Sequence, residues 1–421
     1  MVKIKFLGAA QEVGRSAFLV DAGEKILLDY GVKLTPKETE YPLPIDTNVK
    51  AAIISHAHMD HSGNLPHLYQ RSSPISYMTP PTLDLARMLW FDTLKIAGLE
   101  AMDANFSKLE ISRTEKHTFP VNYGRRMELF DNTFLEFFDA GHIAGSAISR
   151  ITFRDGKTLI YTGDIKLDET RLHPGAVLPK GNCDCLIIEG TYGDREHPPR
   201  KKEEKRFVES VQETVDNGGT ALVSTFAVGR SAEILDVLHE YNVKADIFFD
   251  GMCQKAARIY MNYSKYIKDP HFLKKSLDRA HWVKHMSIRK KALKQPCVIV
   301  TTSGMLQGGP VYAYLPELYH DKHSKLFLTG FQVQQTAGRI LLDTGRINLN
   351  GIMVEPKMSV EKYDFSSHAG LSELFKIIET ISPQKIVIVH SDREVMARFR
   401  VSLEGKGFEV HTPGLGEEIV V

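Results

Sequence analysis

Short runs of apolar residues, separated by polar ones, mark β-strands near the start of the chain. Residues 3–7 alternate between apolar and polar side chains, which is the period of a strand with one buried face. Apolar runs follow at residues 17–20, 25–29 and 51–55, each bounded by turn residues. These runs predict that two β-layers begin to form in this part of the chain.

Further along, apolar positions at helical spacing alternate with strand-like runs. Residues 82–98 follow two prolines and show helical periodicity, and strands are predicted at residues 134–138, 147–153 and 158–161. From about residue 183 the rhythm becomes a regular alternation of strand and helix, which is typical of a parallel sheet. The later predicted elements are strands 185–189, 220–224, 246–249, 297–302, 325–329 and 385–389, and helices 201–217, 231–239, 254–263, 372–380 and 395–404. The fold class predicted from this pattern is α/β.

Composition and charge exclude several classes of protein. The 421 residues are 43% hydrophobic and 25% charged, which is ordinary for a globular protein of two or three domains, or of one fold with a large insertion. The formal net charge is +1, so a polyanion must bind to a local basic surface. Four scattered cysteines without a C-x-x-C pair favour a reducing cytoplasm over a disulfide framework. The charged N-terminus and the lack of a run of about 18 apolar residues predict neither secretion nor a membrane span.

The clearest chemical signal is a cluster of potential metal ligands directly after the apolar run at residues 51–54. His56, His58, Asp60 and His61 follow one another within a few residues. Alternate residues of an extended segment point the same way, so His56 and His58 can share one ion while Asp60 and His61 reach a second position. Imidazole and carboxylate ligands without thiolate favour zinc over manganese or iron.

Three other polar residues follow predicted strands and extend this set. His142 and Asp164 each stand directly after a glycine at a loop position, where they can complete a metal site. Taken alone, each is also compatible with a structural histidine or a turn-capping aspartate. Asp29 ends an apolar run, and we expect it to be either a hydrogen-bond acceptor that orients the histidine loop or an ordinary turn residue.

The order of these residues resembles that of the metallo-β-lactamase superfamily. The resemblance covers residues 1–182 and resumes near the C-terminus. It implies an αββα sandwich with the metals at the edge of two sheets. It also implies two zinc ions per chain, with Mn²⁺ as an alternative metal: the first held by His56, His58 and His142, the second by Asp60 and His61, and Asp164 bridging the two.

Three later motifs resemble those of the β-CASP nucleases, a group within this superfamily. Glu189 and His390 each end a predicted strand, and His368 lies in a loop of small residues. The resemblance implies that His368 is a general acid with Glu189 as its hydrogen-bond partner. It also implies that His390 joins the second zinc, which is typical of the members that act on RNA.

The β-CASP resemblance also implies a domain organisation. Residues 183–357 are expected to form an inserted β-CASP domain, built on a mainly parallel sheet with flanking helices. Residues 1–182 and 358–421 are expected to form the metallo-β-lactamase domain. The change to a strand–helix rhythm near residue 183 independently supports this division.

The chemistry of RNA cleavage accounts for such a set of residues. Hydrolysis needs a nucleophilic water, and two zinc ions lower the pKa of a water from about 15.7 to roughly 7 while neutralising phosphate charge. Protonation of the leaving 3′ oxygen by a histidine that a carboxylate orients adds about 10²- to 10⁴-fold. The resemblance therefore implies a zinc-dependent ribonuclease that acts on single-stranded RNA in processing or decay.

Loops after three predicted strands of the inserted domain resemble sites for backbone phosphates. Loop N–H groups and arginine side chains bind phosphate without reading sequence, although ordinary turn chemistry explains each loop taken alone. The candidate phosphate-binding residues are Phe226, Arg230, Ser303, Gly304, Gln332, Thr336 and Arg339, with Ser367 beside the proposed general acid. The basic runs at residues 200–202 and 289–291 either extend such a groove or form solvated helix faces.

Within the β-CASP group, the chain is most similar to the compact prokaryotic relatives of the endonuclease subunit of the eukaryotic pre-mRNA 3′-end cleavage factor. The sequence QEVGRS at residues 11–16 supports this similarity, and Ser367 stands where RNase J proteins usually have glycine. An endonuclease is therefore favoured. The alternatives are a 5′→3′ exonuclease of RNase J type, a non-catalytic subunit of a processing complex, and a lactamase or thioester hydrolase, which would not account for the inserted domain.

Two further expectations concern the ends of the chain. The KH-type RNA-binding region of longer archaeal relatives is not expected, because the lactamase strands begin at residue 3. Residues 416–421 are expected to form a short apolar strand, which either docks on its own sheet or makes a homodimer contact.

Overall fold

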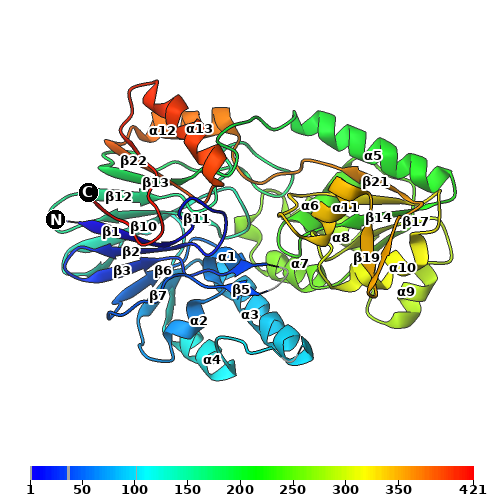
Figure 1. The fold of residues 1–421 in the computed structure, drawn as a ribbon, viewed down its shortest axis with the longest axis horizontal. Helices are drawn as coiled ribbons and strands as arrows, with labels where there is room; N and C mark the ends of the chain where they lie inside the picture. The colour runs from blue at the N-terminus through cyan, green and yellow to red at the C-terminus, as the bar shows by residue number, and fades with distance from the viewer. Residues whose placement is uncertain (1, 36–37, 101) are drawn as a thin grey trace. The chain divides into compact units, whose positions relative to one another are not determined.

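The computed structural model describes residues 2–35, 38–100 and 102–421, and it divides into two compact units. The first unit comprises Met1–Glu196 and Ser367–Val421, and the second comprises His197–Ser366. Both units combine helices with sheets, so the predicted α/β class is confirmed (Figure 1).

The first unit contains two large sheets whose strands come from distant parts of the chain. Each sheet has seven strands among the described residues. The first sheet has the order β24 (Glu418–Val420), β1 (Lys3–Gly8), β2 (Ala17–Asp21), β3 (Lys25–Leu28), β6 (Ala51–Ile53), β7 (Ile75–Met78) and β8 (Thr118–Pro120). The second has the order β23 (Val410–His411), β22 (Lys385–Val389), β13 (Cys185–Glu189), β12 (Thr158–Tyr161), β11 (Ala147–Thr152), β10 (Thr133–Asp139) and β9 (Met127–Phe130). The short strands β4 (Lys33–Leu34) and β5 (Thr39–Glu40) pair with each other.

Apolar side chains from the facing sides of the two sheets form one core. Phe6 and Phe18 from the first sheet and Phe137 and Tyr161 from the second belong to the same buried cluster. The ring of Phe18 packs edge-on against that of Tyr161, with 5.4 Å between the centroids. Burial of each such side chain contributes about 1.5–3 kcal/mol, and this layer therefore fixes the two sheets face to face.

Helices cover the outer faces of both sheets of the first unit (Figure 1). Ile377 and Phe399 from two C-terminal helices pack with Ile188 on the second sheet. On the other side, the buried indole of Trp90 donates a hydrogen bond of 3.0 Å to the carbonyl of Ser62. The helices of this unit are α1 (Met59–Ser62), α2 (Leu65–Leu68), α3 (Pro80–Glu100), α4 (Lys108–Lys116), α12 (Leu371–Ile381) and α13 (Arg393–Glu404). The expected αββα sandwich is confirmed.

The second unit is a parallel sheet with helices on both faces. Its strand order is β16 (His281–Trp282), β15 (Ile247–Asp250), β17 (Cys297–Thr301), β14 (Thr220–Ser224), β18 (Lys325–Leu328) and β21 (Ser359–Lys362), and β19 (Ile347–Leu349) pairs with β20 (Ile352–Val354). Its helices are α5 (Arg200–Asp216), α6 (Arg230–Glu240), α7 (Cys253–Asn262), α8 (Pro270–Arg279), α9 (Met286–Ala292), α10 (Leu315–Leu318) and α11 (Ala337–Thr344), with short 3₁₀ turns η1 (Ser264–Tyr266) and η2 (Pro310–Ala313). The central strands β15, β17 and β14 are buried along their whole length because both faces of the sheet are covered, whereas the edge strands β16 and β21 are partly exposed.

The chain passes between the two units after Glu196 and after Ser366, whereas the domain limits were expected at residues 183 and 357. β13 pairs in parallel with β12 and β22, so this strand completes the second sheet of the first unit. β21 pairs in parallel with β18 and therefore belongs to the second unit. In both cases the pairing of a strand with a distant part of the chain determines to which unit that strand belongs.

The C-terminal strand lies on the sheet of its own chain. β24 pairs antiparallel with β1, with Ile419 opposite Ile4. Of the two alternatives expected for this segment, the structure shows docking on the chain's own sheet. A homodimer contact of the C-terminal region stays a prediction.

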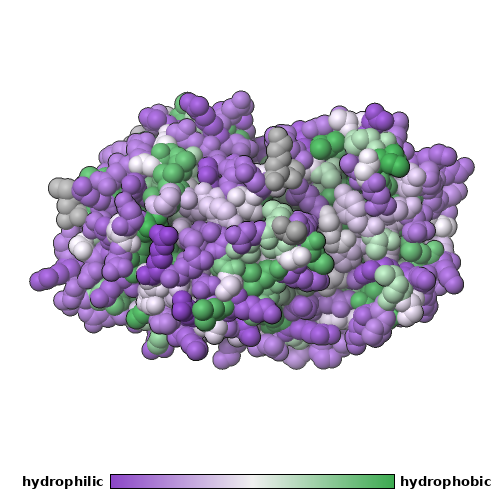
Figure 2. Space-filling model, turned by 60° about the horizontal axis from the view of Figure 1, so that its bottom comes forward, coloured by the Kyte–Doolittle hydropathy of each residue, from purple (hydrophilic) through white to green (hydrophobic). Residues whose placement is uncertain are grey.

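The face of the molecule that Figure 2 draws is mostly hydrophilic. On the face drawn in Figure 2, apolar side chains form several groups among hydrophilic ones. Over the described ranges, none of the helices combines the length and the apolar character that crossing a bilayer requires.

Candidate metal centre

Loops that follow strands of the two sheets in the first unit carry the predicted metal ligands. His56 and His58 follow β6, and α1 begins directly afterwards, so that Asp60 and His61 lie in its single turn. The backbone N–H groups of His61 and Ser62 bond to the carbonyl of His58, which closes this turn. The loop therefore folds back on itself and presents four ligands from one short segment.

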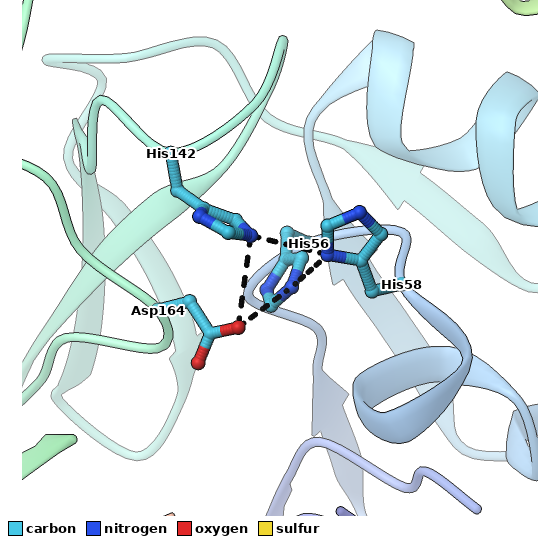
Figure 3. Close-up of side chains that lie close together, drawn as sticks. All are labelled: His56, His58, His142 and Asp164. Carbon is cyan, nitrogen blue, oxygen red and sulfur yellow. Dashed lines mark hydrogen bonds and ion pairs between the residues drawn. The ribbon is translucent and has the colours of Figure 1, made fainter. Parts of the chain in front are cut away.

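One group of ligands comprises His56, His58, His142 and Asp164, whose ligand atoms lie within 4.8 Å of one another (Figure 3). Nδ1 of His58 lies 3.2 Å from Nε2 of His56 and 3.1 Å from Nε2 of His142. Oδ2 of Asp164 lies 3.4 Å from Nε2 of His56 and 3.6 Å from Nε2 of His142. Four donor atoms from three separate loops thus converge on one point.

A second group comprises Asp60, His61 and His390. Nε2 of His390 lies 3.1 Å from Oδ2 of Asp60. The other oxygen of Asp164, Oδ1, lies 3.3 Å from Nε2 of His61 and 3.4 Å from Nδ1 of His390. Asp164 therefore faces both groups, one carboxylate oxygen to each.

These residues fit zinc by spacing and by chemistry. Zinc–nitrogen bonds of about 2.0–2.1 Å in a tetrahedron place neighbouring donor atoms about 3.3 Å apart, close to the separations in the first group. Burial and the nearby His56 lower the pKa of His58 to about 3, so its imidazole is neutral and can offer a lone pair. Among the described residues, the buried atoms His61 Nε2 and Asp164 Oδ1 have no hydrogen-bond partner, which a cation would supply.

A buried carboxylate contacts the second group. Asp29 Oδ2 accepts hydrogen bonds from His61 Nδ1 at 2.7 Å and from the Tyr161 hydroxyl at 2.6 Å. Ser55 donates to the same carboxylate through its N–H and its hydroxyl, both at 2.7 Å. With the Nδ1 proton of His61 directed at Asp29, Nε2 is left as the metal-facing nitrogen. Asp29 thus accepts hydrogen bonds from the histidine loop and from Tyr161, and its role in orienting a metal ligand stays a prediction.

His368 and Glu189 lie beside the first group. Nδ1 of His368 contacts both carboxylate oxygens of Glu189, at 3.0 and 2.9 Å, and its Nε2 lies 3.9 Å from Oδ2 of Asp164. Burial lowers the pKa of His368, but the charges of Glu189 and Asp164 outweigh this effect and raise it to about 9. At neutral pH this imidazole is therefore protonated, and its Nε2 faces Asp164.

Several contacts fix the loop that carries His368. The carbonyl of Ser367 accepts a hydrogen bond of 2.8 Å from His142 Nδ1, and the N–H of Ala369 donates to the carbonyl of Ile165 at 2.7 Å. Lys166 and Glu373, both nearly buried, form an ion pair of 2.5 Å between the Asp164 loop and α12. Ser367, expected to bind phosphate, thus orients a metal ligand through its backbone.

Sequence reasoning missed the residues that support the ligands. Ser55 and Tyr161 were not singled out, although Ser55 directly precedes the histidine motif and Tyr161 ends the strand before Asp164. The Lys166–Glu373 pair joins residues that lie more than two hundred positions apart, and no local pattern marks it.

The candidate phosphate-binding residues lie at the ends of adjacent parallel strands of the second unit. Phe226, Gly304 and Gln332 follow β14, β17 and β18, and a Cβ added at Gly304 would lie 3.0 Å from the backbone nitrogen of Phe226. Gln332 donates to the carbonyls of Gly304 and Gly330, at 2.9 and 3.1 Å. The structure therefore brings these three residues together.

The remaining candidates of the second unit mostly hold local structure. Arg230 is buried and pairs with Glu233, and Thr336 caps α11. Arg339 pairs with Asp343 at 2.8 Å, and Ser303 exchanges hydrogen bonds with the backbone of Gln307. Their contact with phosphate stays a prediction.

Comparison with known proteins finds three matching family models. Residues 3–183 match the model of the anti-Pycsar protein Apyc1, residues 232–341 match the Beta-Casp domain, and residues 353–413 match the Zn-dependent metallo-hydrolase RNA specificity domain.

Similar proteins extend over almost the whole chain. "Probable RNase MJ4" of Methanocaldococcus jannaschii is 39% identical, over 99% of this chain and 100% of that protein. "RNase aCSPSF2" of Saccharolobus solfataricus is 35% identical, over 99% of this chain and 85% of that protein. A solved structure of a protein of unknown function from Enterococcus faecalis is similar in fold, with a TM-score of 0.61 at 16% identity and full coverage of both chains.

We predict that Asp29→Asn weakens zinc binding by about 10- to 100-fold, because the amide NH₂ cannot accept the hydrogen bond that orients His61. Competition with a chromogenic zinc chelator measures this affinity. Asp46→Asn, at an exposed position, is the matched control and should bind zinc as the wild type does. Equal zinc affinity of the Asp29 and Asp46 variants would contradict the orienting role.

Proposed function

The chain belongs to the β-CASP ribonucleases of the metallo-β-lactamase superfamily, and we propose that it hydrolyses phosphodiester bonds of single-stranded RNA at the site built around Asp164. The arrangement of two ligand groups that share Asp164, with a protonated His368 beside them, carries this proposal. Enzymes that catalyse an in-line displacement at phosphate often use two neighbouring metal sites. One cation can then stabilise the attacking oxygen and the other the leaving oxygen.

We propose two Zn²⁺ per chain, with Mn²⁺ as a substitute. His56, His58 and His142 would hold one ion, Asp60, His61 and His390 the other, and Asp164 would bridge them. When bound, such ions supply positive charge that lowers the pKa of a water and neutralises the phosphate. Five of the seven ligand side chains are buried, namely those of His56, His61, His142, Asp164 and His390, whereas His58 and Asp60 are partly exposed.

His368 is proposed to donate a proton to the leaving 3′ oxygen. Its Nδ1 is held by Glu189, so that the proton on Nε2 is the one that can be transferred. The buried Glu189 also accepts a hydrogen bond of 2.9 Å from the N–H of Ile165, next to Asp164. Glu189 thereby holds the acid and the bridging carboxylate in a fixed relation.

We propose endonucleolytic cleavage, with a 5′→3′ exonuclease of RNase J type as the second candidate. Ser367 replaces the glycine that is usual in RNase J proteins, which favours the endonuclease. A non-catalytic subunit of a processing complex is less favoured, because all seven expected metal ligands are present. Membership of a processing or decay complex, a homodimer and a cytoplasmic location stay predictions.

The product pattern from one defined RNA tests the mode of cleavage. The RNA is labelled at either end, carries a 5′ monophosphate or triphosphate, and is incubated with the zinc-loaded protein. We expect discrete internal fragments with both 5′ groups. Mononucleotides released only from the monophosphate RNA would instead establish the exonuclease, and uncut RNA with a zinc-loaded protein would favour the non-catalytic subunit.

We predict that His368→Ala retains zinc but lowers the cleavage rate by about 10²- to 10⁴-fold, because the leaving oxygen loses its proton donor. His117→Ala, at an exposed histidine, is the control and should cleave normally. Normal cleavage by the His368 variant at normal zinc content would remove this residue from the mechanism.

The variant Glu189→Gln tests whether the protonation of His368 matters, because it changes the pKa of this histidine and leaves the histidine itself in place. The carboxylate raises the pKa of His368, so its neutralisation should lower that pKa. The protonated fraction is then lost at a lower pH, and we expect the fall in activity on the alkaline side of the pH–rate profile to move to lower pH. An unmoved alkaline limb in the variant would contradict the coupling between these two residues.

A further inference from the structure

Charge is distributed very unevenly along the chain. Residues 251–296 contain twelve lysines and arginines but only two acidic residues, a net charge of +10. The rest of the chain carries a net charge of −9, which hides this excess in the overall value of +1. A concentration of positive charge in a nearly neutral protein is the electrostatic footprint of a surface that binds a polyanion.

The basic segment forms one edge of the second unit, and we call residues 251–296 the basic lobe. Its short strand β16 is the edge strand of the sheet and pairs with β15. Helices α7 and α8 come before β16 and pack beside α6. Helix α9 comes after it, and its Ala292 joins the core that α10 and α11 also cover. The basic lobe therefore wraps around a sheet edge, with helices on both sides.

Most of the positive side chains in the basic lobe reach solvent. The exposed residues are Lys255, Arg258, Lys265, Lys268, Lys274, Lys275, Lys284, Lys290, Lys291 and Lys294. The two arginines that are partly buried serve the fold: Arg279 donates to backbone carbonyls of Leu238 and Val243, and Arg289 pairs with the buried Asp250. The exposed side chains contribute little to packing, so the fold itself does not explain their number.

An aromatic ring in the edge strand β16 belongs to the basic lobe. Trp282 in β16 is partly exposed, and the guanidinium of Arg258 from α7 lies over it at 5.1 Å from the ring centroid. The indole N–H donates to the carbonyl of Leu277 at 3.0 Å, and the ring packs edge-on against Phe249. These contacts hold the indole and the guanidinium in place as a flat, positively charged platform. Such platforms accept stacked bases of single-stranded nucleic acid.

We propose that the basic lobe of the second unit is an RNA-binding surface in addition to the metal centre of the first unit, and that it holds the phosphate backbone of a long substrate. This inference rests on the proposed function, since it takes RNA as the polyanion. Lysine side chains act as point charges that bind phosphates without reading the base sequence. The surface therefore adds affinity for any RNA long enough to reach it, and that added affinity falls as the salt concentration rises.

The test compares two triple variants that remove the same charge. Lys255, Lys284 and Lys294 are changed to Gln in the basic lobe, and the exposed Lys95, Lys108 and Lys116 are changed to Gln in the first unit as the control. Binding of labelled RNAs of about 30 and about 5 nucleotides to the zinc-loaded full chain is followed at several salt concentrations. The RNA is checked on a gel after each titration, and thermal unfolding confirms that each variant is folded.

For the long RNA, we expect the basic-lobe variant to bind about tenfold more weakly at low salt, with a salt slope reduced by about 2. The control variant should stay within about twofold of the wild type, and the short RNA should bind all three proteins alike. Unchanged binding of the long RNA by the basic-lobe variant would overturn the proposal and leave the charge to another class of partner. An equal loss in the control would overturn it as well.

Failure of the proposed function gives a different result. A wild-type protein that binds the long RNA through the basic lobe but does not cut it would contradict the nuclease and leave the binding surface intact. A protein that cuts RNA while its basic-lobe variant binds normally would contradict only the surface.

Discussion

The buried carboxylate of Asp164 is the constraint on which the rest of the centre depends. Burial by itself raises the pKa of Asp164, but the facing His61 and His390 outweigh this effect and keep it well below its ordinary value. The carboxylate is therefore ionised, with one oxygen toward each ligand group. Its Oδ1 is buried without a hydrogen-bond partner, which is costly for an ionised group, and the lowered pKa values of His56, His58 and His142 leave neutral imidazoles whose lone pairs converge on the same space. Bound cations would relieve both of these costs. The arrangement of the ligands therefore fits metal binding better than a core that is stable without a metal.

The scaffold fixes two of the histidine ligands and the proposed acid His368 through partners on the opposite side of each ring. Asp29 binds Nδ1 of His61, and the carbonyl of Ser367 binds Nδ1 of His142. Glu189 does the same for His368. Each contact selects the nitrogen that faces the centre, and most of these partners lie in loops or strand ends of the sandwich. The two sheets thereby act as a rigid frame that sets protonation as well as position.

The sequence predicted the parts of this account that depend on neighbouring residues. The ligand loop at residues 56–61 was recognisable because its side chains are adjacent, and the α/β class followed from hydrophobic spacing. The helix α4 was not predicted, although Ser107 and Glu110 form a capping box that marks its start. The residues at which the chain passes between the units, and the Lys166–Glu373 ion pair, could not be predicted from local patterns. Both depend on contacts between segments that are far apart in the sequence. Net charge also concealed the basic lobe, since an average over the chain cancels opposite local excesses.

The number of zinc ions bound per chain tests the central claim most directly. Native mass spectrometry of the zinc-loaded wild type and of Asp164→Asn counts them, because intact masses resolve each bound ion. The shared carboxylate predicts two ions in the wild type, and fewer or more weakly held ions in the variant. Two ions held equally tightly by both proteins, or a wild type that binds none, would contradict the account.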